Sequence, residues 1–172
     1  MKIKTLIAAA ALVLFAACGQ PYRATTATVV VAPGTTKASF SEQYPYASHV
    51  VWMRYDAATI PIDWELAGWT VLDDHDYLVR FDMDKNYYYA WYDKNGNWVG
   101  SSYGLVDYTS MPMAVMMTLT SKYPGYTITS VYKEFQRDRI AYEVELKNDN
   151  TKVKVLVDIY GNVVKAKTRS LY

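Results

Sequence analysis

The last third of the chain alternates apolar and polar residues with a period of two. Tyrosine, valine or leucine holds every second position over residues 142–147 and 152–157, with glutamate or lysine at most positions between them. This alternation predicts two half-buried β-strands. Asparagine, aspartate and glycine at residues 148–150 and 158–162 predict the turns that lead to the second strand and to a third over residues 163–167. The pattern therefore indicates an antiparallel meander.

A helical period precedes this meander. Apolar residues recur at helical spacing at Val115, Met116, Leu119 and Tyr123. Residues 109–112 (Thr-Ser-Met-Pro) offer a capping hydroxyl before a proline in the first turn, and Pro124 ends the helix. A shorter helix is expected at about residues 36–44.

Two halves of the chain carry matching landmarks. Tyr44-Pro45 corresponds to Tyr123-Pro124, and Gly96-Asn97 corresponds to Gly161-Asn162. The Tyr-Pro pairs are 79 residues apart and the Gly-Asn pairs 65, so the first copy holds 14 extra residues. We therefore predict an α+β chain of two tandem repeats, each a helix followed by an antiparallel β-meander. The first repeat spans residues 37–106 with an insertion at about 56–69, and the second spans 107–172.

The order of these motifs resembles the PepSY-like family, which is related to β-lactamase inhibitor proteins. The resemblance rests on a helix, Tyr44-Pro45-x-Ala47 with Trp52 after it, and Tyr92-Asp93-x-x-Gly96-x-Trp98-Val99. It covers residues 37–172. It implies two helix-plus-sheet units whose sheets form one curved surface, with the helices on one face. It also implies a binding module that captures a protein or peptide on its open sheet face, an envelope enzyme to be inhibited being one such partner.

The N-terminus is predicted to be an export signal. Two lysines precede an apolar run over residues 6–17, which is too short for a permanent membrane span. Small residues then precede Cys18, the only cysteine, in a pattern that resembles a bacterial lipobox. We expect residues 1–17 to be removed and Cys18 to be acylated, which would hold the protein on a membrane. The expected membrane is the outer membrane, with the protein on its periplasmic side. An ordinary secretory signal with an incidental cysteine is the alternative.

The stretch after the cysteine is predicted to be a flexible tether over residues 18–36. It is rich in Thr, Ala, Val, Pro and Gly, with Arg23 as its only charge. Residues 28–31 (Thr-Val-Val-Val) could instead add an edge strand to the sheet.

An aromatic cluster is the candidate partner-binding site. If the register of the second copy applies to the first, the outward face of the sheet carries Tyr87, Tyr89, Trp91 and Trp98. Exposed aromatic clusters are where binding energy concentrates. The alternative is that the insertion, with Trp64 and Trp69, folds over this face and makes a second small core. In that case the protein could be a structural envelope lipoprotein with no dedicated ligand.

Composition excludes several classes of function. Lys and Arg total 18 and Asp and Glu 17, so no basic field is available for nucleic acid. One cysteine permits neither an intrachain disulfide nor a multi-thiolate zinc site. The chain lacks the Gly-x-Ser-x-Gly, His-Glu-x-x-His and phosphate-loop motifs. We therefore expect no enzyme activity and no cofactor.

Two weak metal patterns remain. Asp82 to Asp93 imitates the start of a calcium loop, but Tyr87 stands where that loop needs glycine, so a hairpin turn is expected. Asp73-Asp74-His75-Asp76 sets an imidazole beside carboxylates, and we expect a solvated turn there rather than a metal site.

Overall fold

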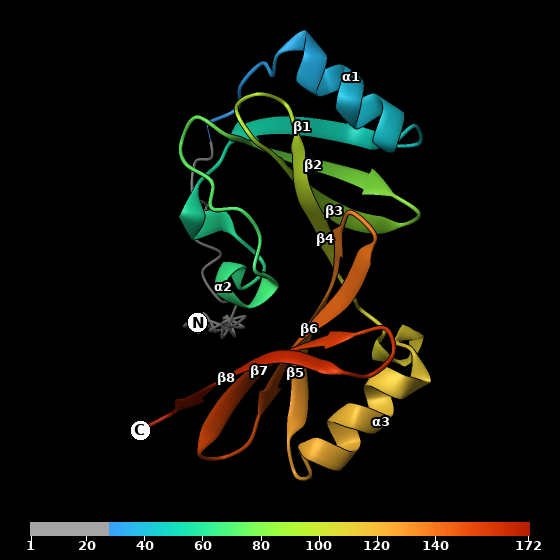
Figure 1. Cartoon of the computed structure of the whole chain (residues 1–172), viewed down its shortest axis with the longest axis vertical. Helices are drawn as coiled ribbons and strands as arrows, with labels where there is room; N and C mark the ends of the chain where they lie inside the picture. The colour runs from blue at the N-terminus through green and yellow to red at the C-terminus, as the bar shows by residue number, and fades with distance from the viewer. Residues whose placement is uncertain (1–27) are drawn as a thin grey trace, which may run out of the picture.

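The computed structural model describes residues 28–172, in which eight strands form one antiparallel sheet (Figure 1). The predicted signal peptide and Cys18 lie outside these residues. The strands pair in the order in which they follow along the chain. They are β1 (Ser48–Arg54), β2 (Tyr77–Met83), β3 (Asn86–Tyr92), β4 (Trp98–Gly104), β5 (Thr127–Gln136), β6 (Arg139–Lys147), β7 (Thr151–Asp158) and β8 (Val163–Ser170).

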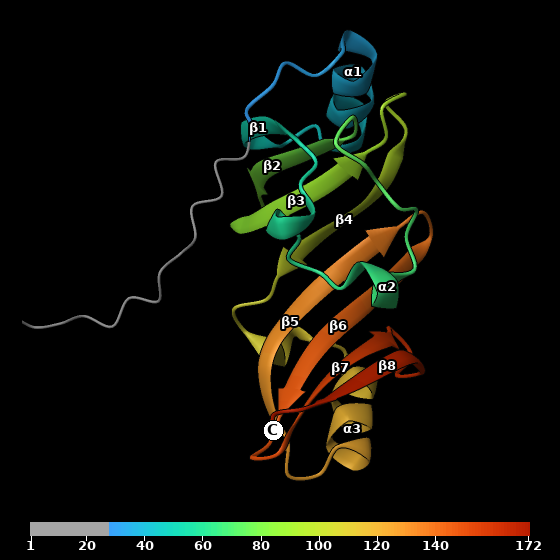
Figure 2. The same ribbon diagram turned by 90° about the vertical axis from the view of Figure 1, so that its left-hand side faces the viewer.

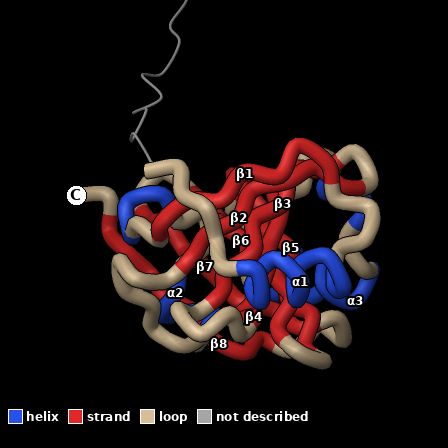
Figure 3. The backbone as a smooth tube through the Cα atoms, turned by 90° about the horizontal axis from the view of Figure 1, so that it is seen from above, coloured by secondary structure: helices blue, strands red, loops and turns tan. Residues whose placement is uncertain are grey.

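Three α-helices lie on the two faces of this sheet. They are α1 (Gly34–Gln43), α2 (Trp64–Ala67) and α3 (Met113–Lys122), joined by two 3-10 turns, η1 (Ala57–Thr59) and η2 (Tyr108–Ser110). Helices α1 and α3 cover one face, whereas α2 lies on the other (Figures 2 and 3). Within the described part of the chain, no helix combines the length and the apolar character that crossing a membrane requires.

The predicted fold class of two helix-plus-meander repeats with helices on one face is wrong. Strands β4 and β5 pair with each other, from Ser101 opposite Phe135 to Gly104 opposite Tyr132, so the eight strands make a single sheet. A separate meander would leave the backbone N–H and C=O groups of β4 and β5 unpaired at an edge, and the pairing satisfies them. Helix α2, on the opposite face, also contradicts a one-sided arrangement of helices.

The strands predicted at residues 142–167 are confirmed as β6, β7 and β8. Val144 lies opposite Val155, and both pack in a core with Val115 and Leu119 of α3. The predicted hydroxyl cap of α3 is wrong, because Pro112 precedes the helix and the Ser110 hydroxyl donates to the Asp107 carbonyl in η2 instead.

Two matching turns hold α1 and α3 against the sheet. In the first turn, the Asp93 carboxylate accepts from the backbone N–H groups of the residues on either side of Gly96. In the second, the Asp158 carboxylate does the same on either side of Gly161. Both glycines have positive φ, +88° and +87°. A Cβ atom would lie 2.8 Å from the Thr36 hydroxyl at Gly96 and 2.6 Å from the Ala114 carbonyl at Gly161. Glycine is therefore required by backbone angle and by close approach to a helix.

The edge of β1 is partly covered by the segment before α1. Val29 forms an isolated bridge with Met53, and the Val30 N–H donates to the Trp52 carbonyl. The edge-strand alternative for residues 28–31 is thus realised as a single bridge.

Candidate binding face and its α2 loop

Strand β3 carries a row of three aromatic side chains on the face turned toward α2. We call Tyr87, Tyr89 and Trp91 the aromatic row, and the side of the sheet on which it lies the α2 face. The ring centroids of Tyr87 and Tyr89 are 5.4 Å apart in an edge arrangement, and those of Tyr89 and Trp91 are 6.1 Å apart and stacked. Strand pleating places alternate residues on opposite faces, so these three share the side predicted for them.

Trp98 does not belong to this row. Tyr92 lies opposite Trp98 and Trp91 lies opposite Gly100, so the register shifts by one residue at a β-bulge. The Trp98 ring packs with the α1 core, and its Nε1 donates to the Ser101 hydroxyl at 2.8 Å. Its predicted outward position is wrong because a one-residue shift moves a side chain to the other face.

A long loop covers the inner end of the aromatic row. Residues 56–75, which connect β1 to β2 and contain η1 and α2, are called the α2 loop. Trp91 is fully buried, with its ring centroid 5.5 Å from those of Trp64 and Trp69. Tyr87 remains 46% exposed. The four predicted residues are therefore not one exposed cluster, and at Trp91 the structure matches the alternative of a second small core.

Local features fix the conformation of the α2 loop. The Asp63 carboxylate caps α2 by accepting from the Leu66 N–H at 3.0 Å, and Gly68 ends the helix at φ +66°. Gly100 on β4 leaves room for the Trp69 ring, because a Cβ there would lie 2.8 Å from three of its atoms.

The α2 loop is closed at its base. The Tyr55 N–H donates to the Asp76 carbonyl at 3.0 Å, directly after the last pair of β1 and β2. The buried Asp76 carboxylate accepts from the backbone N–H groups of Asp73 and Lys94, at 2.6 and 2.7 Å. The two ends of the loop are thus held side by side independently of its tip.

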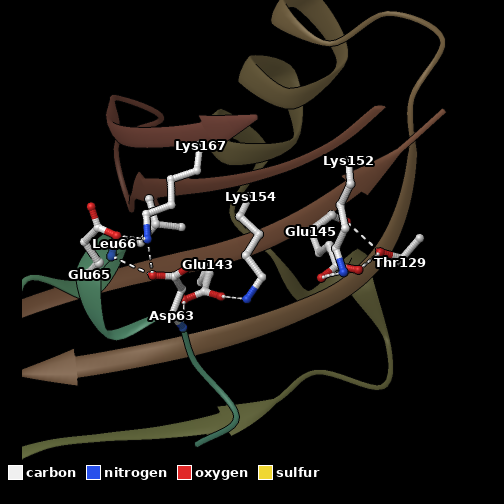
Figure 4. Close-up of polar contacts among 9 residues, drawn as sticks. All are labelled: Asp63, Glu65, Leu66, Thr129, Glu143, Glu145, Lys152, Lys154 and Lys167. Atoms are coloured by element: carbon white, nitrogen blue, oxygen red, sulfur yellow. Dashed lines mark hydrogen bonds and ion pairs between the residues drawn. The ribbon is translucent and has the colours of Figure 1, made fainter. Parts of the chain in front are cut away.

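Basic residues of β7 and β8 form the second part of the α2 face. The register places five cations on this side, which we call the basic cluster: Lys152, Lys154, Lys165, Lys167 and Arg169. The Lys167 ammonium lies 2.8 Å from the Asp63 carboxylate and 2.5 Å from that of Glu65 (Figure 4). The α2 loop therefore lies against the lysines of β8.

This contact shifts the pKa values of both partners. Burial alone would raise the pKa of Asp63, but hydrogen bonds from the Lys167 ammonium and the Leu66 N–H hold it below its ordinary value. Burial alone would lower the pKa of Lys167, and the two carboxylates raise it instead. The pair is ionised at neutral pH.

Two glutamates are buried beneath the α2 loop. Glu143 accepts from the Asp63 N–H at 2.6 Å and from the Lys154 ammonium at 3.1 Å (Figure 4). Glu134 is 1% exposed and accepts no hydrogen bond from the described residues, but its carboxyl group shares a hydrogen bond with the Glu143 carboxylate. Burial raises the pKa of Glu134 to about 9, and the neighbouring Glu143 carboxylate adds to the rise. Glu134 is therefore a neutral acid at pH 7.

The two candidate metal patterns, at residues 82–93 and 73–76, form a β-hairpin and a turn. The Asp82 segment forms the expected hairpin, in which Met83 lies opposite Asn86. Within residues 28–172, one group of three acidic or histidine side chains has its potential ligand atoms within 4.8 Å of one another: Asp73, Asp74 and His75. All three are exposed, in a turn where the Asp73 carboxylate accepts from the His75 N–H at 2.8 Å.

Sequence reasoning missed three features of this face. It did not find the contact of Lys167 with the insertion, the buried acid at Glu134, or Arg80, whose guanidinium lies 5.9 Å from the Tyr87 ring centroid. The sequence around Glu134 did not indicate burial, because a glutamate that follows Lys133 usually faces solvent.

Comparison with known proteins identifies one matching family and several solved structures with a similar fold. A family model described as beta-lactamase-inhibitor-like and PepSY-like matches residues 75–165. A BLIP-like protein from Bacteroides fragilis is 16% identical, with a TM-score of 0.65 over 83% of this chain and 88% of that one. A DUF2874 family protein from Bacteroides uniformis is 22% identical, with a TM-score of 0.60 over 80% of this chain and 90% of that one.

A third solved structure, described as "putative periplasmic proteins" from Bacteroides eggerthii, is 15% identical with a TM-score of 0.61, over 81% of this chain and 90% of that one. At these identities the likeness concerns the fold. No curated protein matches the chain. The family match spans more than half of the residues, and it confirms the resemblance seen in the motifs. The chain belongs to the PepSY-like, β-lactamase-inhibitor-like family.

Proposed function

We propose that this protein is a lipid-anchored envelope protein that captures a protein or peptide on the α2 face of its sheet. The observation that carries the proposal is the aromatic row, which emerges from beneath the α2 loop and ends at the half-exposed Tyr87. Arg80 lies under the Tyr87 ring and adds a positive charge beside it. Aromatic and arginine side chains together are the usual anchors of protein interfaces. The proposal includes no catalytic step.

Capture from an envelope extract tests this directly. The full-length protein carrying Tyr87→Ser and Tyr89→Ser is compared with the wild type and with a Tyr160→Ser control, since Tyr160 is an exposed tyrosine in the turn before β8. We expect a partner that the wild type and the control retain and the double variant loses. Equal recovery by all three proteins contradicts the proposed site.

The family suggests one partner to test first. A β-lactamase mixed with the purified protein would lose activity if this chain shares the inhibitory role for which its family is named. Loss of that inhibition in the Tyr87→Ser, Tyr89→Ser variant would assign the inhibition to the α2 face.

The membrane anchor has a separate test. Cys18 follows small residues at the end of an apolar run. We expect the mature protein to begin at Cys18 with added acyl mass, and Cys18→Ser to release it from membranes, because several acyl chains hold a protein far better than one. Intact mass spectrometry decides this: a mature chain without acyl mass contradicts the anchor. A periplasmic position is supported by the description of the Bacteroides eggerthii relative.

A structural envelope role is the second candidate. It is favoured by the burial of Trp91 beneath Trp64 and Trp69, which turns part of the aromatic row into core. If wild-type protein retains no partner in an extract where control captures succeed, this second role is supported instead.

A further inference from the structure

We propose that the α2 loop is an internal ligand of the α2 face, and that the external partner is a polypeptide segment with carboxylates next to a tryptophan or another large aromatic residue. This inference rests on the proposed function, because it assumes that the α2 face is the face that binds. It adds the chemistry of the partner and the place that the partner occupies.

The α2 loop complements the face in both charge and shape. Its segment Asp63-Trp64-Glu65 sets two carboxylates around one tryptophan. The carboxylates meet Lys167 of the basic cluster (Figure 4). The Trp64 ring packs edge-on against Trp91 of the aromatic row, with ring centroids 5.5 Å apart. A partner that takes the same position needs the same two kinds of group.

The α2 loop is separable from the sheet that it covers. In the described chain, no backbone–backbone hydrogen bond joins residues 56–75 to a strand, and the eight strands pair with one another without it. The bonds that fasten the loop use side chains of the sheet: Arg139 donates to the Ala67 carbonyl at 2.6 Å, and Lys165 donates to the Glu65 carbonyl at 3.0 Å. Because Tyr55 and Asp76 close its base, the loop can leave the face while the pairing of β1 and β2 stays intact.

Closure leaves polar atoms unsatisfied beneath the loop. Buried side-chain atoms without a hydrogen-bond partner in the described residues gather on this face: Nε1 of Trp69, Nε1 of Trp91 and Oγ of Ser102. Each such atom costs free energy in the closed state. When the loop opens, these atoms can form hydrogen bonds with water or with polar groups of a partner. This lowers the free energy needed to move the α2 loop off the sheet.

Binding of the loop sequence as a separate peptide tests the inference. Full-length protein with Trp69→Ala, which removes the ring that lies over Gly100, is titrated with a peptide of residues 61–71. We expect the peptide to bind this variant and to raise its unfolding temperature toward that of the wild type. We expect the wild type to bind the peptide at least about tenfold more weakly than this variant, because its own loop occupies the face.

Two controls assign the chemistry. A peptide with amides in place of the two carboxylates should bind about tenfold more weakly, and so should the natural peptide to a variant that adds Lys167→Gln to Trp69→Ala. Failure of the natural peptide to bind the folded Trp69→Ala protein, or equal binding of the amide peptide, overturns the inference.

If the Trp69→Ala protein does not fold, amide hydrogen exchange of the wild type tests whether the α2 loop opens. The amides of Leu66, Ala67 and Gly68 should exchange at least about tenfold faster than those of Val144 and Val155 in the sheet, through local opening of the loop. Equal protection of both groups overturns the inference. The proposed function is tested separately, by the loss of capture in the Tyr87→Ser, Tyr89→Ser variant. A negative result in the peptide or exchange experiment therefore contradicts the role of the loop without contradicting the proposed function.

Discussion

Glu134 is a charged residue type in a buried environment. It follows Lys133 in β5, where a charged residue usually faces solvent, yet it is 1% exposed and lies beside Glu143 under the α2 loop. A charged pair in this place would be strongly unfavourable, so the folded state keeps Glu134 protonated. This carboxyl makes the stability of the protein depend on pH.

We expect Glu134→Gln to reduce that pH dependence. The unfolded chain loses this proton above the ordinary value of 4.5, whereas the folded state keeps it up to about pH 9. Between these values the folded protein holds more protons, so its stability falls as pH rises. Urea unfolding of wild type and variant at pH 5 and pH 8 measures the effect, and the variant should lose less stability between the two. An unchanged pH dependence would mean that Glu134 is charged in the fold.

Trp91 is a core residue although the alternation of β3 placed it on the binding face. We expect Trp91→Ala to lower the free energy of unfolding by about 3–5 kcal/mol, because it empties the space between Trp64 and Trp69. Tyr87→Ala, at the exposed end of the same row, should cost less than about 1 kcal/mol. Chemical denaturation of both variants compares them, and similar losses would contradict the division of the row into a core end and a surface end.

At the scale of elements, the two Asp-to-Asn turns fix how helices meet strands. Each turn holds an aspartate that accepts backbone N–H bonds and a glycine that touches a helix, Gly96 at α1 and Gly161 at α3. The two matching Gly-Asn pairs in the sequence therefore correspond to two similar contacts between a turn and a helix.

Gly161→Ala tests this contact. A Cβ atom would lie 2.6 Å from the Ala114 carbonyl, so α3 must move in addition to the strain of φ +87°. Gly125→Ala is the matched control, because Gly125 has φ +79° and open space around it. The control should cost about 1–2 kcal/mol from backbone strain alone, and Gly161→Ala should cost clearly more. Equal losses in thermal unfolding would show that backbone angle alone selects glycine.

At the scale of the whole molecule, the pairing of β4 with β5 joins the halves of the chain into one sheet. The stack of Tyr88, Tyr103 and Phe135 crosses this junction, with ring centroids 4.5–6.4 Å apart. The α2 loop crosses it on the opposite face, from β1 to Lys167 on β8. Both contacts favour cooperative unfolding.

Tryptophan fluorescence offers a test of that cooperativity. All five tryptophans lie within residues 52–98, so their emission reports on the first half of the sheet and on the α2 loop, whose tryptophan cluster also contacts Tyr132 of β5. We expect Val144→Ala, in the core beside α3, to shift the fluorescence midpoint as much as the midpoint by far-UV circular dichroism. A fluorescence curve that does not move would show that the halves unfold independently.

Features that depend on near neighbours in the chain were predictable before the structure. The alternation at residues 142–147 predicts β6, the asparagine-rich stretch at 148–150 predicts its turn, and the order of motifs identifies the family. Each of these depends on residues a few positions apart, where the period of the side chains and the chemistry of the turn leave few choices.

How the strands combine, and which aromatic side chains are covered, became known from the folded structure. The pairing of β4 with β5 joins segments about 30 residues apart, and no local period encodes it. A one-residue bulge moved Trp98 to the α1 side, and packing of Trp64 and Trp69 covered Trp91. The physical reason is that strand register and burial depend on contacts between distant segments, so an alternating pattern defines two faces without saying what covers each of them.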